Sequence, residues 1–135
     1  MLTGIDPLLS GEVLAVLDGM GHGDALVIAD ANFPARRLCT QVLTMQGANS
    51  TSALKAVLTV FPQDEEEAPF TMSSPDGPLA IHSEFATECR RHGVELRSID
   101  RHQFYDQAGS ASAVIRTGEV RPYGNIIIYK GVVTS

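Results

Sequence analysis

One short apolar run limits what this chain can fold into more than any other feature of the sequence. Residues Ala25 to Ala29 are apolar without a break, and they lie between a glycine-rich turn and Asp30. A strand with one wet face alternates apolar and polar residues, whereas a strand buried on both faces is apolar throughout. The run therefore predicts a central strand in a sheet that is covered on both sides.

Patterns typical of helices and strands alternate along the rest of the chain. Apolar residues at helical spacing predict helices at about residues 11–20, 50–61, 81–92 and 101–108, the first behind Ser10 as N-cap. Short apolar runs predict strands at residues 42–45, 95–99, 113–117 and 126–129, and residues 63–78 read mostly as loop around Phe70-Thr71-Met72. We expect a single α/β domain over residues 1–135, with three layers (α/β/α) and a mixed, mainly parallel central sheet.

The charge balance and the apolar runs exclude several classes of partner. The formal net charge is −6 and no basic stripe is present, whereas a nucleic-acid surface needs clustered cations. No apolar run approaches the ~20 residues of a membrane-spanning helix, and no basic segment leads into an apolar core at the N-terminus. We therefore expect a cytoplasmic protein with no membrane or nucleic-acid partner. Cys39 and Cys89 lack metal or redox spacing, so free thiols are expected.

Three further patterns carry no predicted chemistry. The glycines within residues 19–23 follow a helix and precede a strand, which is the reverse of the order in a dinucleotide-binding loop. His82, His92 and His102 fall in different predicted elements without the spacing of a zinc site. The acidic run of residues 64–67 lies between two prolines and is interpreted as a solvated loop. No metal and no cofactor are predicted.

Two titratable side chains stand at the ends of the central strand. His22 lies between two glycines, which leave its backbone free and its ring unshielded. Asp30 follows the strand directly, at the position where open α/β sheets place ligand-binding groups. The alternative is that His22 decorates a solvated turn and that Asp30 caps the next element. Spacing alone does not separate these interpretations.

Strand direction decides which polar residues can share a site. Asp30 and Arg101 each follow a predicted strand, so parallel strands bring both to one edge of the sheet. Tyr123 and Asn125 precede the last strand and join that edge if it runs antiparallel, as edge strands of mixed sheets often do. Otherwise Arg101 is a surface charge and Tyr123 to Asn125 form only a turn.

His22 does not fit the same edge. The eight residue steps from His22 to Asp30 span roughly 26 Å if the chain is extended. Either the glycine-flanked loop folds back sharply, or a neighbouring subunit of a symmetric oligomer supplies His22 to the site. We favour the second hypothesis.

The chain resembles the L-fucose mutarotase family, to which the D-ribose pyranases are related. The resemblance covers both ends of the chain in order and matches the middle only loosely. Its motifs are Ile5-Asp6-Pro7-Leu8-Leu9-Ser10, Met20-Gly21-His22-Gly23-Asp24, Asp30-Ala31-Asn32-Phe33-Pro34-Ala35, Thr117-Gly118-Glu119 and Tyr123-Gly124-Asn125-Ile126.

The resemblance implies a role for each matching residue. His22 corresponds to the family's proton donor, and Asp30 to a sugar-binding aspartate. Tyr123, Gly124 and Asn125 correspond to further sugar contacts, and the remaining sugar-binding position falls on Arg101. An arginine there is typical of fucose mutarotases, whereas a shift by one residue to His102 restores the pyranase pattern. The resemblance further implies a ring-like homo-oligomer such as a decamer, with sites at subunit interfaces.

The expected reaction is the interconversion of the α and β anomers of a monosaccharide, with L-fucose favoured as substrate. A proton reaches the ring oxygen, another leaves the anomeric hydroxyl, and the ring opens and recloses on either face. Histidine suits the first step because its unperturbed pKa is about 6.5. The anomeric proton is removed either by Asp30, with a pKa raised by burial, or through a water molecule that mediates between His22 and the substrate. The alternatives are pyranase activity on D-ribose and a non-catalytic sugar-binding protein.

Overall fold

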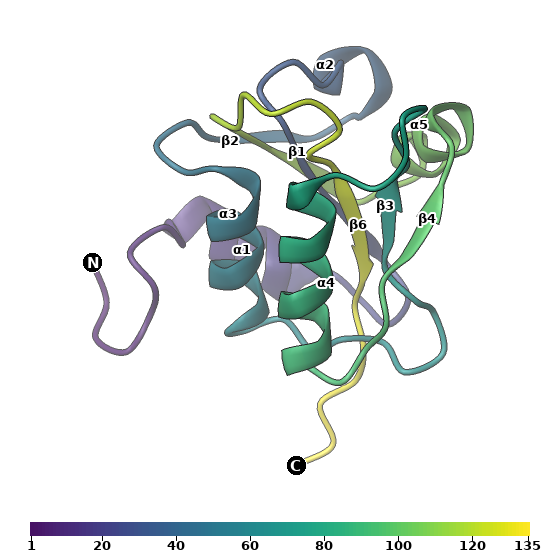
Figure 1. Cartoon of the computed structure of the whole chain (residues 1–135). Coiled ribbons are helices and arrows are strands. Elements are labelled where there is room, and N and C mark those ends of the chain that lie inside the picture. Colours follow the sequence, from purple (N-terminus) through teal and green to yellow (C-terminus); the bar gives the residue numbers. More distant parts are fainter.

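The middle layer of the protein is a six-stranded sheet (Figure 1). The computed structural model describes residues 1–135. The strands are β1 (Ala25–Ala29), β2 (Val42–Met45), β3 (Phe70–Met72), β4 (Arg97–Ile99), β5 (Ala113–Thr117) and β6 (Ile126–Tyr129). The helices are α1 (Gly11–Gly19), α2 (Ala35–Leu38), α3 (Ser50–Leu58), α4 (Ala80–Arg91) and α5 (Arg101–Gly109).

The strand order β2-β5-β1-β6-β3-β4 gives a mixed, mainly parallel sheet, as predicted. β1 pairs with β5 in parallel, β5 with β2, and β3 with β4. β6 alone runs antiparallel, between β1 and β3. The expectation that this strand lies at the sheet edge is therefore wrong. All four of its residues, Ile126 to Tyr129, are buried, as expected for an interior strand of a sheet that is covered on both faces.

Helices cover both faces of the sheet, which confirms the three-layer prediction. The larger core packs α1, α3 and α4 against one face, where Leu26 and Ile28 of β1 point. The smaller core packs α2 and α5 against the other face, where Val27 and Ala29 point. Because successive side chains of a strand face opposite ways, the uniformly apolar β1 contributes to both cores.

Local signals set most element ends. The Ser10 hydroxyl accepts a hydrogen bond from the Val13 N–H at 3.2 Å and starts α1, while Asp100 and Gln103 form the predicted capping box of α5. The chain departs from the predictions at Met20, which is the extended C-cap of α1, and at Phe61, which lies beyond α3. The four-residue helix α2 carries no pattern that spacing can detect.

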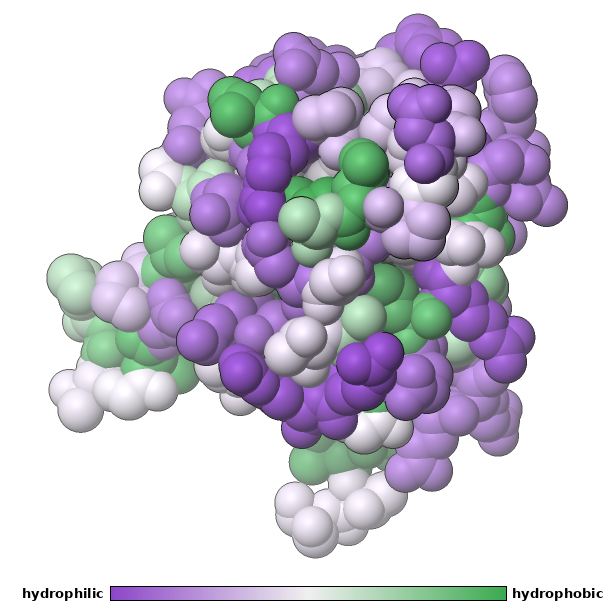
Figure 2. Space-filling view, in the orientation of Figure 1, coloured by the Kyte–Doolittle hydropathy of each residue, from purple (hydrophilic) through white to green (hydrophobic).

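The surface is largely polar, with apolar side chains at a few positions. None of the five helices combines the length and apolarity that a membrane span requires. Figure 2 shows apolar side chains toward both chain ends on this face of the molecule. The large apolar residues most exposed to solvent are Met1, Leu2, Val60, Val120, Val132 and Val133.

Candidate functional site

Asp30 and Asn125 form a reciprocal pair at one edge of the sheet. β1 ends before Asp30 and the antiparallel β6 begins after Asn125, so the two residues meet. The Asp30 N–H donates to Asn125 Oδ1 at 2.8 Å, and Asn125 Nδ2 donates to Asp30 Oδ2 at 3.1 Å. Both residues are buried. The pairing fixes the amide orientation of Asn125 and the direction of the Asp30 carboxylate.

The environment of Asp30 makes its carboxylate a stronger base than usual. Burial raises the pKa of Asp30 above its ordinary value, and hydrogen bonds from the Asn32 N–H and the Asn125 amide only partly offset this. The Asn32 N–H lies 3.0 Å from Asp30 Oδ1. A carboxylate in this state can take up a proton from a weak acid such as a sugar hydroxyl more readily than one in water.

A cavity of about 270 Å³ opens over this pair. Sites for drug-sized ligands are typically ~300 to 1,000 Å³, so this volume suits a smaller molecule. The structure brings four of the predicted site residues into its wall: Asp30, Arg101, Tyr123 and Asn125. The other lining residues are Asn32, Phe33, Pro34, Met72, Tyr105, Val120 and Pro122. Residues with carboxylate, guanidinium, amide and phenol groups thus border one small volume.

Arg101 reaches this cavity because of its place at the start of α5. It is the first residue after the Asp100 cap and is exposed, and α5 begins at the edge of the sheet where β4 ends. The neighbouring His102 is also exposed but does not line the cavity. The geometry therefore favours Arg101 over His102 at this position.

Gly124 is not among the residues that line the cavity, although its neighbours Tyr123 and Asn125 are. A Cβ atom there would meet Ile81 Cδ1 at 2.7 Å and Glu119 Cγ at 3.0 Å, so a larger residue would force these buried side chains to shift. Its carbonyl oxygen accepts a hydrogen bond from the Ser50 hydroxyl at 2.7 Å. Tyr123, just before it, adopts a positive φ of 60°, which is uncommon for a residue with a side chain.

His22 lies away from the cavity, in the loop before β1. Its side chain is 57% exposed, and its Nε2 atom is 3.5 Å from Asp64 Oδ1. The loop does not fold back, since β1 runs between His22 and Asp30. One chain therefore brings together the predicted sugar-binding residues but not the predicted proton donor.

Comparison with known proteins shows to which family the chain belongs. Residues 3–133 match the RbsD / FucU transport protein family. The chain belongs to this family. An L-fucose mutarotase of Actinobacillus pleuropneumoniae serotype 5b (strain L20) is 38% identical over 140 residues, covering 98% of this chain and 97% of the relative.

Two solved structures match nearly the whole chain. The fucose mutarotase of Streptococcus pneumoniae in complex with L-fucose is 31% identical with a TM-score of 0.91, covering 98% of this chain and all of that one (100%). Bacillus subtilis RbsD complexed with D-ribose is 24% identical with a TM-score of 0.75, covering 99% of this chain and 100% of its own. The similarity to RbsD establishes that the two proteins share a fold.

A network of charges anchors the loop that carries Tyr123 in this RbsD / FucU family member. Arg121 donates to Glu84 on α4 at 2.6 Å and to Glu119 at 2.9 Å. Burial raises the pKa of Glu119, but its hydrogen bonds with Arg121 outweigh this and leave the pKa below its ordinary value. Hydrogen bonds from Arg121 likewise lower the pKa of Glu84. Sequence reasoning assigned Arg121 and Glu84 no role, because their long separation carries no spacing signal.

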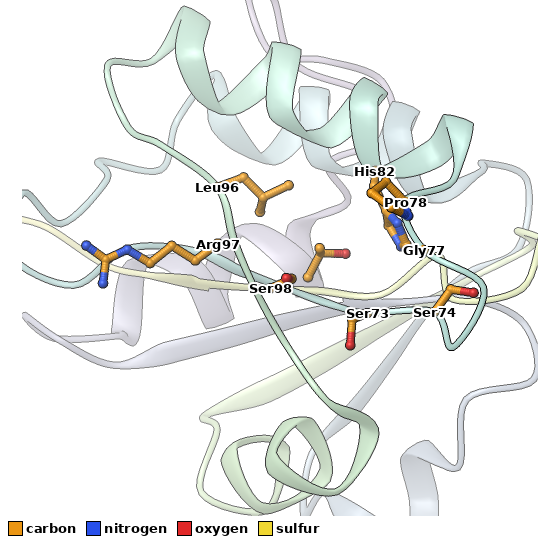
Figure 3. Close-up of a pocket in the computed structure, with 9 residues that line it drawn as sticks. Ser73, Ser74, Gly77, Pro78, His82, Leu96, Arg97 and Ser98 are labelled. Atoms are coloured by element: carbon orange, nitrogen blue, oxygen red, sulfur yellow. The ribbon is translucent and has the colours of Figure 1, made fainter.

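A second cavity of about 210 Å³ lies between α4 and strands β3 and β4 (Figure 3). His82, Leu96 and Ser98 are among its lining residues. His82 links it to the site, since Nδ1 accepts the Leu79 N–H at 3.1 Å and Nε2 is 3.1 Å from the Tyr123 carbonyl oxygen. Because Nδ1 is the acceptor, Nε2 carries the proton and donates to that carbonyl. His82 thus supports Tyr123 from behind.

Asp64 corrects the interpretation of the acidic run as a solvated loop. Glu65, Glu66 and Glu67 are exposed, but Asp64 is buried, with its carboxylate beside His22. No sequence signal distinguished it from the glutamates that follow. No group of three or more His, Cys, Asp or Glu side chains converges to hold a metal ion.

Proposed function

We propose that this protein is a mutarotase that interconverts the α and β anomers of a monosaccharide, with L-fucose as the favoured substrate. One observation carries the proposal: the buried Asp30–Asn125 pair, Arg101 and Tyr123 line one small cavity. Membership of the RbsD / FucU family and 38% identity to an L-fucose mutarotase support the reaction class. These comparisons also make a carbohydrate isomerase the best-supported class of enzyme.

In the proposed mechanism, His22 donates a proton to the ring oxygen while the anomeric hydroxyl loses one. The bond between the anomeric carbon and the ring oxygen breaks, its electron pair goes to the ring oxygen, and an open-chain aldehyde forms. Reclosure on the other face of the carbonyl reverses these proton transfers and gives the second anomer. No net oxidation or reduction occurs.

Asp30 is the proposed base for the anomeric hydroxyl, directly or through one water molecule. Burial raises the pKa of its carboxyl group, which brings this pKa closer to that of the sugar hydroxyl. Asn125 and Arg101 can hold other hydroxyls, because an amide offers a donor and an acceptor and a guanidinium offers a planar array of donors. Tyr123 supplies a hydroxyl contact or a face for the apolar side of the sugar. Gly124 allows the loop that carries Tyr123 to pack closely against its neighbours.

We further propose that a neighbouring subunit of a ring-like homo-oligomer, such as a decamer, completes the site. The separation of His22 from the cavity by β1 supports this. Val120, at the cavity rim, is 81% exposed, as a residue covered by a partner is in the isolated chain. A symmetric ring repeats one such contact at every interface, so every site gains its His22.

L-fucose is favoured over D-ribose by the residue at one position. Arg101 lines the cavity and His102 does not, and the resemblance assigns arginine to fucose mutarotases and histidine to ribose pyranases. Pyranase activity on D-ribose is the second candidate, since B. subtilis RbsD shares the fold. A non-catalytic sugar-binding role is the third.

We also propose that the protein acts in the cytoplasm, where thiols stay reduced. Cys39 and Cys89 are buried free cysteines in the two different cores, on opposite faces of the sheet, so they cannot pair within one chain. Fractionation of the source cells tests this directly. Recovery in a secreted fraction would contradict it.

Exchange spectroscopy separates the three candidate functions. Magnetisation-transfer NMR measures α-to-β exchange of L-fucose, and pyranose-to-furanose exchange of D-ribose, with and without the protein. We expect faster exchange for L-fucose, and the His22→Ala variant is expected to lose this acceleration while remaining folded. Sugar binding with no faster exchange of any sugar would leave only the non-catalytic function.

A further inference from the structure

Side chains from three different elements hold the backbone of residues 123–125. Each of the three carbonyl oxygens in this segment accepts a hydrogen bond from a buried side chain. In chain order of the carbonyls, the donors are the His82 ring of α4 at 3.1 Å, the Ser50 hydroxyl of α3 at 2.7 Å and the Thr71 hydroxyl of β3 at 3.0 Å. The segment is therefore fixed at three successive positions by parts of the chain that are distant in sequence.

Tyr123 depends on this support more than Asn125 does. The Asn125 side chain is bonded to Asp30, and its carbonyl oxygen also accepts the Met72 N–H at 3.2 Å. The Tyr123 ring packs partly against the smaller core, but its hydroxyl has no hydrogen-bond partner within the chain, and His82 alone holds its carbonyl oxygen. Its φ of 60° also costs free energy for a residue with a side chain. The direction in which Tyr123 borders the cavity therefore follows from its backbone.

Hydrogen bonds rather than close packing orient the His82 ring. Leu79 precedes α4 and has no side-chain oxygen to cap the helix, so Nδ1 of His82 accepts the Leu79 N–H at 3.1 Å. This N–H can only donate and the Tyr123 carbonyl can only accept, so the neutral ring with its proton on Nε2 satisfies both. Figure 3 shows the ring projecting from the first turn of α4 into the second cavity. Open space beside the ring leaves its two hydrogen bonds to set its orientation.

We propose that His82 is a positioning residue for Tyr123. Its Nε2–H holds the Tyr123 carbonyl oxygen, keeps the left-handed backbone and so directs the phenol into the cavity that Asp30 and Asn125 line. His82 lines the second cavity and not this one, so it touches no sugar. The inference rests on the proposed function, in which Tyr123 contacts the sugar. His82 acts on sugar binding and not on the proton transfers.

Two amide variants separate the two hydrogen bonds of His82. In His82→Asn, the amide oxygen takes the place of Nδ1 and still accepts the Leu79 N–H, but the side chain is too short to reach Tyr123. In His82→Gln, the longer side chain carries an N–H donor to the place of Nε2. His92→Asn makes the same change at the exposed C-terminal end of the same helix and is the matched control.

The variants are compared in the full-length protein by L-fucose titration of anomer exchange. His82→Asn is expected to raise the half-saturating sugar concentration about 3- to 10-fold, as the loss of one hydrogen bond usually does. The rate at saturation is expected to stay within about twofold, because Tyr123 moves no proton. His82→Gln is expected to return half-saturation to within about twofold of the wild type. His92→Asn is expected to change neither quantity, and a merely structural role of His82 would lower the rate through loss of folded protein without moving half-saturation.

Two NMR signals report on the contact without activity. The sequence contains a single Tyr-Gly pair, Tyr123–Gly124, so carbonyl-13C tyrosine combined with nitrogen-15 glycine gives one resonance for this bond. We expect His82→Asn to shift this resonance, and His82→Gln and His92→Asn to leave it close to its wild-type position. In the wild-type protein, nitrogen-15 NMR of the His82 ring is expected to show the proton on Nε2. This wild-type spectrum tests the proposal even if the His82 variants fail to fold.

The outcomes separate this inference from the proposed function. Wild-type protein that fails to accelerate exchange refutes the mutarotase function, whereas the two NMR signals still report on His82. A wild-type His82 ring with its proton on Nδ1 overturns the inference alone. So does a His82→Asn variant with wild-type half-saturation and an unmoved Tyr123–Gly124 resonance. Equal losses in His82→Asn and in either His82→Gln or His92→Asn also overturn it, because the reach to Tyr123 would then not explain them.

Discussion

At the scale of single residues, burial raises the pKa of Asp30, the residue proposed as the base. Asp30 is held by Asn125 and by the Asn32 N–H while its carboxylate borders the cavity. The raised pKa follows mainly from lost hydration, and it links the rate of the proposed reaction to pH.

The rate of sugar exchange is expected to fall on acidification at a pH above the ordinary aspartate pKa of 3.8, because the raised pKa of Asp30 means that its basic form is lost earlier. Asp30→Asn is expected to reduce exchange by about 10²-fold and to remove this acid limb. The pH profile of anomer exchange measures both effects. Asp106→Asn, which neutralises an exposed carboxylate on α5, should keep the wild-type profile. An unchanged profile in Asp30→Asn would exclude Asp30 as the base.

Gly124→Ala tests the close packing around Gly124. The added Cβ meets Ile81 and Glu119 at contact distances of 2.7 and 3.0 Å, so we expect a loss of about 1 to 3 kcal/mol in the free energy of unfolding. Weaker sugar binding is also expected, since the loop must shift. Gly11→Ala is the control, because its Cβ meets nothing within 4 Å. Urea unfolding of both variants measures the difference, and equal stabilities would contradict the packing argument.

At the scale of elements, the strands with uniformly apolar sequences were predictable, but the neighbours of β6 in the sheet were not. β1, β5 and β6 begin and end where their sequences predict, because residues buried on both faces have no polar alternation. Tyr123 and Asn125 could reach the site only if β6 ran antiparallel to β1, and β6 does run in this direction. The interior place of β6 depends on long-range pairing, which local sequence does not encode.

Two features of the site had no local signal at all. The burial of Asp64 follows from its bond to the end of β6, which is distant in sequence. The bridge from Arg121 to α4 likewise joins elements that the sequence does not show to be neighbours. The position of Arg101 at the start of α5 was predictable, because the capping box of α5 is local and sets which residue starts the helix.

The Arg121 bridge predicts that the site loop and α4 act as one unit. Arg121→Gln leaves the buried Glu119 without its cation, and we expect a loss of about 1 to 3 kcal/mol in the free energy of unfolding, together with a higher half-saturating sugar concentration. Arg90→Gln is the matched control, because its pair with Glu95 is largely exposed and should change stability by less than about 1 kcal/mol. Thermal unfolding and sugar titration compare the two. Equal effects would show that the bridge is an ordinary surface pair.

At the scale of the whole molecule, the two ends of β1 carry different parts of the proposed chemistry. His22 lies at one end, and Asp30 with the cavity lies at the other. A neighbouring copy that supplies His22 therefore couples activity to assembly.

Subunit mixing tests this coupling. His22→Ala and Asp30→Asn are each expected to be inactive, but co-assembly from equal amounts should restore about a quarter of the sites, those with His22 from one variant and Asp30 from the other. Anomer exchange is measured after unfolding and refolding the mixture, with each variant refolded alone as the control. No recovery in mixed oligomers, or full activity in a monomer, would refute the shared site.

The proposed division of the site between the two ends of β1 has a kinetic consequence. An enzyme whose site lies within one chain works at a rate proportional to its concentration at any dilution. In the proposed shared site, the cavity of an isolated chain has Asp30 but lacks His22, so in the dilute regime, where subunits separate, the rate is expected to rise with a power of protein concentration greater than one. The abundance of the protein then acts as a threshold below which the sugar relaxes only at its spontaneous rate.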